Sequence, residues 1–258
     1  MNLKTETVSH MFNYDFPLSP KARTYLKFEN IFLSAEESCS LKTTQETLCL
    51  LRCIVDYIDL VDGLGAIKIE LQKDLEKCDA KLRQWFNDPD VDKEFVAQLR
   101  EEIQKARVAL DGFTRQRTVL QTDPIIESIK PRFLTPCGVN CFDTPLFEYW
   151  IHQPQEERVI KAQKWLSEMN CLKVPVFTVL YLWRLCADYQ KRVARKGFMQ
   201  ENADACDLIN IKYSEDIKGY PVVSGFQSRI NIRFLPYEKG APVGDIEFEL
   251  AYIKGSLL

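Results

Sequence analysis

The sequence predicts an α+β protein with a mainly helical domain over residues 19–195 and a small antiparallel β-domain made of residues 1–18 and 196–258. Through the middle of the chain, apolar residues recur at spacings of three and four, which is typical of amphipathic helices. From Gly197 onward the pattern changes to short alternating runs separated by turn residues: DLINIKY, RINIRFLP and DIEFELAY. The partly alternating run TVSHMFNYDF near the start is expected to add an N-terminal strand to this sheet.

Each helix of the middle part has its own local signal. Ser19 and Pro20 supply an N-cap and a first helical position, and Thr43 with Glu46 forms a capping-box pattern before a dense apolar run. Two long amphipathic segments separated by NDPD predict an antiparallel helical hairpin. Later helices are expected at 156–169 and 174–195, whereas residues 133–153 fit neither pattern and could join either domain.

Composition limits the classes of function. The chain carries a formal net charge of -3, which argues against a dedicated nucleic-acid-binding protein but allows a local basic patch. No apolar run approaches the roughly 20 residues of a membrane span, and the polar start lacks a signal-peptide pattern, so we expect a cytosolic protein.

Cysteine and histidine usage indicates no metal site. The nine cysteines are an odd number scattered through apolar patterns, which favours reduced, mostly buried thiols. The tight pair Cys137 and Cys141 has no second pair nearby, and the only histidines are His10 and His152. Structural zinc takes four ligands, so we expect neither zinc nor another cofactor.

Signatures of catalysis are missing from the sequence. It contains no glycine-rich phosphate loop, no G-x-S-x-G or H-E-x-x-H motif, and no histidine placed for a triad. The acidic residues are numerous, but none forms a distinctive pair. The sequence therefore predicts an interaction protein and not an enzyme.

Arginines gather on one side of the predicted strand RINIRFLP. Alternation places Ile230, Ile232 and Phe234 on one face and Arg229 and Arg233 on the other. Two interpretations stay open. If this strand forms a hairpin with the next one, the arginines form cross-strand pairs with Asp245, Glu247 and Glu249. Otherwise, or in addition, they form a binding surface.

Two other basic segments have simple structural explanations. In KARTYLK, Arg23 and Lys27 lie one helical turn apart on what would be a solvated helix face. The segment KRVARK is expected to close a helix, where cations complement the helix dipole. Together with the arginine strand, KRVARK supports an alternative function, a basic-patch adaptor for nucleic acid.

One pair of charges falls inside apolar helical patterns. Glu29 lies on the apolar side of its helix, and Arg52 interrupts the apolar run of the next helix. Because a buried carboxylate normally needs a partner, we expect Glu29 and Arg52 to form a structural ion pair.

Several segments, in this order and at this spacing, carry a resemblance to a known family. They are LSPKARTYLKFE, IELQKDLEKCDAKLRQW with a following Pro-Asp break, CFDTP with a tryptophan soon after, GFMQEN, YPVVSGFQSRINIRFLP and IEFELAY. The fifth is the most specific. In these segments the chain resembles the ZapD family of bacterial cell-division proteins over most of its length.

The resemblance implies a function and a site. Proteins similar to ZapD are cytoplasmic, act at the division site, bind the C-terminal tail of the tubulin-like protein FtsZ, and bundle FtsZ filaments as dimers without being enzymes. Their tail-binding surface is a basic patch, which here would comprise Arg229, Arg233, Arg23 and Lys27, the last a lysine in place of an arginine. The patch is less basic after Asp123, because the next residue is the uncharged Pro124. The dimer interface is expected in the helical domain.

Overall fold

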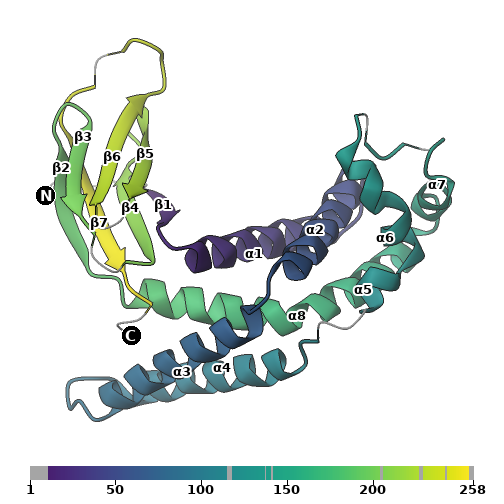
Figure 1. Ribbon diagram of the computed structural model, residues 1–258, viewed down its shortest axis with the longest axis horizontal. Coiled ribbons are helices and arrows are strands. Elements are labelled where there is room, and N and C mark those ends of the chain that lie inside the picture. Colours follow the sequence, from purple (N-terminus) through teal and green to yellow (C-terminus); the bar gives the residue numbers. More distant parts are fainter. Residues whose placement is uncertain are drawn as a thin grey trace, which may run out of the picture. The chain divides into compact units, whose positions relative to one another are not determined.

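The computed structural model describes residues 11–114, 118–136, 138–140, 142–203, 206–226, 229–241 and 243–255. The chain divides into two compact units. One comprises Met1–Thr24 and Leu182–Leu258, and the other comprises Tyr25–Tyr181. The first contains the β-strands and the second is helical (Figure 1). The α+β prediction is therefore confirmed, including an N-terminal strand in the sheet.

The first helices begin at the predicted caps. They are α1 (Pro20–Glu37) and α2 (Thr44–Gly63). Ser19 Oγ accepts a hydrogen bond from the Ala22 amide at 3.1 Å, and Thr43 Oγ1 accepts one from the Glu46 amide at 3.1 Å. The buried side of α1 carries Ala22, Tyr25, Phe28, Phe32 and Ala35. Leu33 is exposed, and Glu29, which was expected on the apolar side of this helix, lies at the flank of the buried stripe and is half-buried.

Helices α3 (Ile67–Phe86) and α4 (Lys93–Asp111) form the predicted antiparallel hairpin and lie side by side in Figure 1. Asp92 caps α4 by accepting hydrogen bonds from the amides of Glu94 and Phe95. The buried residues of the pair recur at the helical period: Leu71, Leu75, Cys78, Leu82, Leu99, Ile103, Ala106 and Leu110. Burial of this shared apolar seam is what holds the two helices together.

The remaining helical elements include the region that the sequence left unassigned. They are α5 (Val119–Thr122), α6 (Pro124–Ile129), the 3₁₀ helix η1 (Lys130–Leu134), α7 (Pro145–Ile151) and α8 (Gln155–Leu185). Residues 133–153 thus carry the end of η1 and all of α7, in the helical unit. The expected break between two later helices is wrong. A buried stripe continues past Pro175 within one helix and comprises Trp165, Met169, Leu172, Val176, Val179 and Trp183.

The β-strands form two antiparallel sheets that share one core. The strands are β1 (Met11–Pro17), β2 (Tyr189–Ala194), β3 (Phe198–Asn202), β4 (Leu208–Ser214), β5 (Gly219–Phe226), β6 (Arg229–Pro236) and β7 (Ile246–Ile253). Their orders are β1-β4-β7-β2 and β3-β6-β5. The ring centre of Phe234 in β6 lies 5.4 Å from that of Tyr213 in β4 and 5.4 Å from that of Phe248 in β7. These contacts fix which face of β6 points inward.

Candidate functional site

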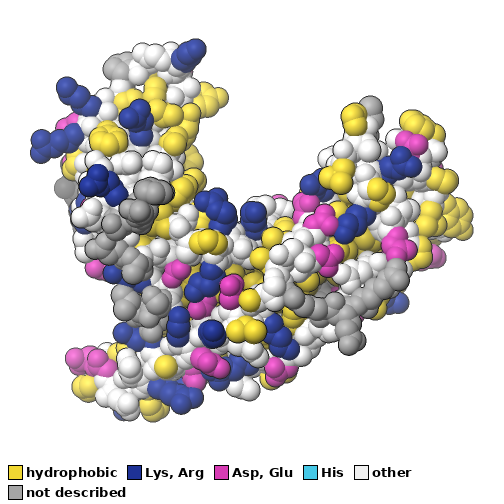
Figure 2. All heavy atoms as spheres, viewed as in Figure 1, with side chains coloured by type: hydrophobic (Ala, Val, Ile, Leu, Met, Phe, Trp, Pro, Cys, Tyr) yellow, Lys and Arg dark blue, Asp and Glu magenta, His cyan; other side chains and the backbone are white. Residues whose placement is uncertain are grey.

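Strand β6 presents its arginines outward, as the alternation predicted. Ile230, Ile232 and Phe234 are buried in the core between the sheets, whereas Arg229 and Arg233 are exposed. Figure 2 shows Lys and Arg side chains among hydrophobic ones over the region where Figure 1 places β3, β5 and β6. With a strand rise of about 3.3 Å per residue, the two arginines are spaced roughly 13 Å apart along β6.

The neighbours of these arginines follow from the strand register. Residues directly opposite each other in antiparallel strands place their side chains on the same face. Strand β3 contributes Phe198 opposite Arg233, and β5 contributes Val222 on the other side of Arg233. We call this outer surface of the three-stranded sheet the arginine face; its described side chains are Phe198, Gln200, Asn202, Tyr220, Val222, Ser224, Arg229, Asn231, Arg233 and Leu235.

No carboxylate belongs to the described part of the arginine face. Within the described part of the chain, neither Arg229 nor Arg233 forms an ion pair, and the residues that lie beside them in register are apolar or uncharged. Arg233 instead holds its guanidinium carbon 5.6 Å from the ring centre of Phe198. Among the described residues, no carboxylate therefore occupies the N–H donors of either guanidinium.

The hairpin between β6 and β7 that one of the two interpretations required does not form. Strand β7 lies in the other sheet, where Glu249 is opposite Lys191 and Glu247 is opposite Val193. Asp245 precedes β7 and accepts a hydrogen bond from the Lys196 amide at 2.7 Å. The pairing differs because β6 is already bonded on both sides, by β3 and β5. The charge ladder that would have explained the arginines structurally is thus absent from the described strands.

The segment KRVARK does not end a helix. It forms β2 and the turn into β3, and Lys196 and Gly197 have φ of 49° and 73°, the positive values that a tight hairpin turn requires. Arg192 pairs with Glu201 of β3, with Nη2 2.9 Å from Oε1. The hydrogen bonds from Arg192 hold the pKa of Glu201 below its usual range. One cation of the segment is therefore already neutralised, which weakens its case as a basic patch.

The other predicted site residues lie in α1. Arg23 and Lys27 are both exposed and one helical turn apart. Arg23 belongs to the unit that carries the sheets, and Lys27 belongs to the helical unit. The Nζ atom of their neighbour Lys21 lies 5.1 Å from a ring centre of Trp183. Pro124 begins α6 behind its N-cap Asp123, so the uncharged residue at this position has a structural role.

Arg52 does not form the expected ion pair with Glu29. Its Nε lies 2.9 Å from Oδ1 of Asp56, one turn further along α2, and its guanidinium carbon lies 5.4 Å from the ring centre of Phe133. The Arg52 side chain is 47% exposed, because α2 buries the residues on either side of it instead. Among the described residues, the ion pair of Arg52 is therefore with Asp56 and not with Glu29.

The cysteines and histidines considered for a metal site belong only in part to the described residues. Cys137, Cys141 and His10 lie outside the described residues. The remaining histidine, His152, has its Nδ1 2.8 Å from the Glu148 carbonyl oxygen. Among the side chains that the structure describes, no cluster of His, Cys, Asp and Glu could hold a metal ion.

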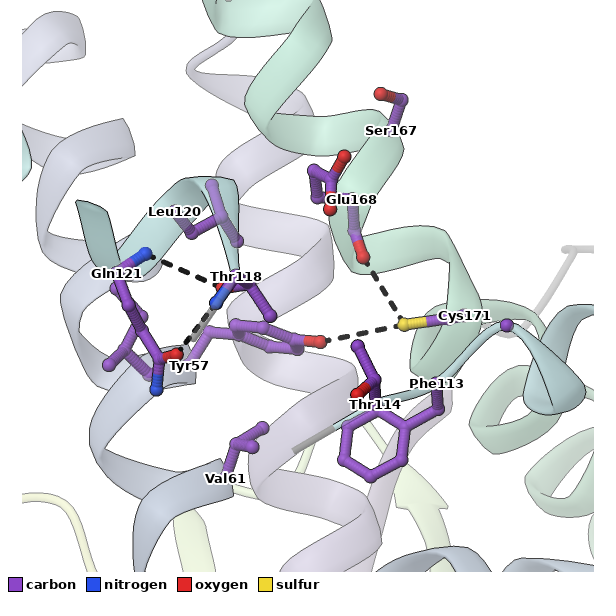
Figure 3. A pocket seen from close by; sticks show the side chains of 12 residues that line it. Tyr57, Val61, Phe113, Thr114, Thr118, Leu120, Gln121, Ser167, Glu168 and Cys171 are labelled. Carbon is purple, nitrogen blue, oxygen red and sulfur yellow. Dashed lines mark hydrogen bonds between the residues drawn. The ribbon is translucent and has the colours of Figure 1, made fainter. Parts of the chain in front are cut away.

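A pocket of about 180 Å³ lies in the helical unit between α2, α5 and α8 (Figure 3). The Tyr57 hydroxyl lies 3.8 Å from Sγ of Cys171, which donates to the Glu168 carbonyl oxygen at 3.2 Å. Burial raises the pKa of both Tyr57 and Cys171. Both groups are therefore protonated at neutral pH, which is the opposite of what a nucleophile or a general base needs.

Sequence reasoning missed the side chains that surround the arginines. Phe198, Tyr220 and Val222 come from strands on either side of β6, and only the register reveals that they share its outer face. The sequence gives a signal only for Phe198, which shares one face of its strand with the polar Gln200 and Asn202; the face of β5 that carries Tyr220 and Val222 is not polar. A sequence without known strand pairing gives no means to assemble them.

Comparison with known proteins identifies the family. The model of a family described as "ZapD: Cell division protein" matches residues 26–233. The chain belongs to the ZapD family of cell division proteins. The cell division protein ZapD of Pectobacterium carotovorum subsp. carotovorum is 32% identical over 240 residues, covering 92% of this chain and 96% of that protein. ZapD of Serratia proteamaculans is 32% identical over 246 residues, covering 95% and 98%.

A third relative, ZapD of Vibrio atlanticus, is 31% identical over 249 residues and covers 95% of this chain. The part of the chain matched by the ZapD family model includes Phe198, Arg229 and Arg233, whereas Arg23 precedes it. A role in cell division is therefore established for this ZapD-family chain. No helix among its described residues is long and apolar enough to cross a membrane.

Proposed function

We propose that this chain binds the C-terminal tail of FtsZ on its arginine face and, as a dimer, cross-links FtsZ filaments into bundles. In this role it would stabilise the ring of filaments at midcell, in the cytoplasm, without catalysing a reaction. Membership of the ZapD family supports a role in cell division. The binding surface is inferred from the geometry of β6.

One observation carries the proposal. Arg229 and Arg233 are exposed on the same face, and no carboxylate among the described residues neutralises either of them. A guanidinium binds carboxylate through two parallel hydrogen bonds, which suits it to an acidic peptide. Arg23 and Lys27 of α1 are proposed as further members of the basic patch, on the resemblance alone.

Cross-linking follows from symmetry and avidity. A two-fold dimer offers two equal peptide sites, and a filament offers one tail for every subunit. Once one tail is bound, a second tail on a neighbouring filament is captured at a high effective concentration. Individual sites of about micromolar affinity would then be sufficient to hold bundles. We propose that the dimer interface lies in the helical unit.

The alternative function, a nucleic-acid adaptor, has lost part of its support. Arg192 of the KRVARK segment is paired with Glu201, and the overall charge of the chain is -3. Binding to nucleic acid and binding to the FtsZ tail would both weaken as salt is added. Only binding to the tail would depend on the amino-acid sequence of the peptide.

Co-sedimentation with FtsZ filaments tests the proposal. We expect this chain to pellet with filaments of full-length FtsZ and to increase their light scattering. Filaments of FtsZ that lacks its C-terminal tail should still pellet but should leave this chain in the supernatant. Equal pelleting with tail-less filaments would overturn the proposed site on FtsZ. A concentration-independent monomer in analytical ultracentrifugation would overturn the cross-linking mechanism.

A further inference from the structure

We propose that an aromatic groove beside the arginine face holds apolar side chains of the same acidic peptide whose carboxylates the arginines bind. This inference rests on the proposed function and adds a second element to it. The arginines would supply attraction to any acidic chain. The groove would supply selection among acidic chains by their apolar residues.

The groove lies entirely within the unit that carries the β-sheets. Its volume is about 460 Å³, and its lining includes Phe12 of β1, Tyr213 of β4, Tyr220 of β5, and Tyr237 with Ala241 after β6. Phe12 is 46% exposed, Tyr220 is 47% exposed and Tyr237 is 84% exposed. The ring centres of Phe12 and Tyr213 lie 5.2 Å apart and form one wall. Pockets for small ligands and side chains commonly have this size and an aromatic lining.

Tyr220 belongs both to the lining of the groove and to the arginine face. Tyr220 lies two residues before Val222 in β5, so both side chains point to the same face of the sheet. Val222 is directly opposite Arg233, and Tyr220 is directly opposite Leu235. A short extended peptide could therefore place one side chain in the groove and the next acidic one on Arg233.

The groove and the arginine face differ in the charges that they carry. The rim of the groove carries Glu215, Glu238 and Lys218, so it does not attract an anion by itself. The arginine face carries cations and, within the described residues, no opposing carboxylate. An acidic peptide would therefore direct its carboxylates to the arginines and its apolar residues to the groove. Because β5 ends its sheet in the order β3-β6-β5, its outer edge also offers backbone groups to an extended chain.

Fluorescence polarisation with two labelled peptides tests this inference. The first is the FtsZ C-terminal tail, and the second has the same charges but serine at every apolar position. The protein variants are Tyr220→Ser and Tyr237→Ser, with Tyr149→Ser as a control because Tyr149 is 69% exposed on α7 of the helical unit. We expect each groove variant to weaken binding of the native peptide roughly five- to tenfold, with no effect on the serine peptide. The control should bind both peptides like the wild type.

The outcomes separate this inference from the proposed function. If the groove variants bind the native peptide as tightly as the wild type, while reversal of the arginines abolishes binding, the groove inference is overturned and the tail site stands. If the wild type binds neither peptide, both the groove inference and the proposed tail-binding function are wrong. If the groove variants change only the sedimentation coefficient of the free protein, the groove belongs to a second copy of this chain, and the inference is wrong. Thermal unfolding of each variant confirms that these exposed changes leave the fold intact.

Discussion

Arg233 and Phe198 lie directly opposite each other in β6 and β3, with the guanidinium carbon 5.6 Å from the ring centre. The aromatic ring contacts the guanidinium through a cation–π interaction. A carboxylate in the same place would neutralise the positive charge, but the ring does not. Arg192, in contrast, is held by Glu201. Arg192 thus belongs to an ion pair within the protein, whereas Arg233 has no carboxylate partner among the described residues.

Replacing Phe198 by alanine should weaken binding of the FtsZ tail without unfolding the protein. The ring orients Arg233, and a cation–π contact at an exposed site contributes about 0.5–1 kcal/mol, so we expect a two- to fivefold loss of affinity. Polarisation titrations measure it. Val193→Ala, on the exposed side of β2 in the other sheet, is the matched control. Unchanged affinity of Phe198→Ala would show that the ring does not orient the arginine for binding.

Charge reversal in α1 tests whether the basic patch extends beyond the sheet. Arg23→Glu and Lys27→Glu should each weaken tail binding, by about three- to tenfold at low salt, because each removes an attraction and adds a repulsion. Lys164→Glu, an exposed lysine of α8, is the charge-matched control. Titrations in low and high salt measure the effect. If all three variants lose affinity equally, the effect reflects only net charge, and Arg23 and Lys27 do not belong to the site.

The turn between β2 and β3 should be sensitive to a single methyl group. Gly197 has φ of 73°, and a Cβ built there would lie 2.5 Å from Cγ1 of Val243. Gly240 has φ of 86°, with nothing within 4 Å of such a Cβ. Gly197→Ala should therefore cost about 2–3 kcal/mol of unfolding free energy and Gly240→Ala about 1 kcal/mol. Urea denaturation compares them, and equal costs would mean that backbone strain alone matters at both positions.

The helical hairpin should lose stability in acid through Asp79. Burial alone would raise the pKa of this carboxyl, but hydrogen bonds from Arg100 at 3.0 Å and Arg83 at 2.6 Å outweigh it, so the pKa is lowered. A lowered pKa in the folded state gives a stabilisation that is full above the unfolded value, near 4, and is lost as pH falls through the folded value. Asp79→Asn should therefore cost about 1–2 kcal/mol at pH 7.

Urea unfolding of the wild type and Asp79→Asn across pH 2–7 measures this dependence. The two curves should converge in acid, because the wild-type carboxyl is then protonated as well. Glu101→Gln is the control, since Glu101 pairs with Lys105 on an exposed flank of α4, and it should show no measurable change. A constant difference between wild type and Asp79→Asn at all pH values would show that the charge of Asp79 is not the cause.

Local patterns in the sequence predicted the elements well. The caps at Ser19 and Thr43, the hairpin of α3 and α4, and the alternation of β6 all depend on residues close together in the chain. They were confirmed because side-chain periodicity and capping are decided locally. The same alternation correctly placed Arg229 and Arg233 on the exposed face of β6.

Pairing between strands could not be predicted in the same way. Neighbouring strands often form hairpins, which suggested that β7 would place its carboxylates beside the arginines, yet β7 joined the other sheet. The pairing is decided by the core between the two sheets, where Phe234 contacts Tyr213 and Phe248. The identity of the arginines' neighbours, and with it the case for a binding surface, therefore depended on the structure.

The most direct test of the central claim is the affinity of a labelled FtsZ C-terminal tail peptide for the wild type and for an Arg229→Glu, Arg233→Glu variant. Lys73→Glu with Lys164→Glu, two exposed lysines of α3 and α8 outside the arginine face, serves as the charge-matched control, and circular dichroism verifies each fold. We predict that the arginine variant loses detectable binding, while the control keeps an affinity close to that of the wild type. Full binding by a folded arginine variant would contradict the account, because the tail would then be bound elsewhere on the protein.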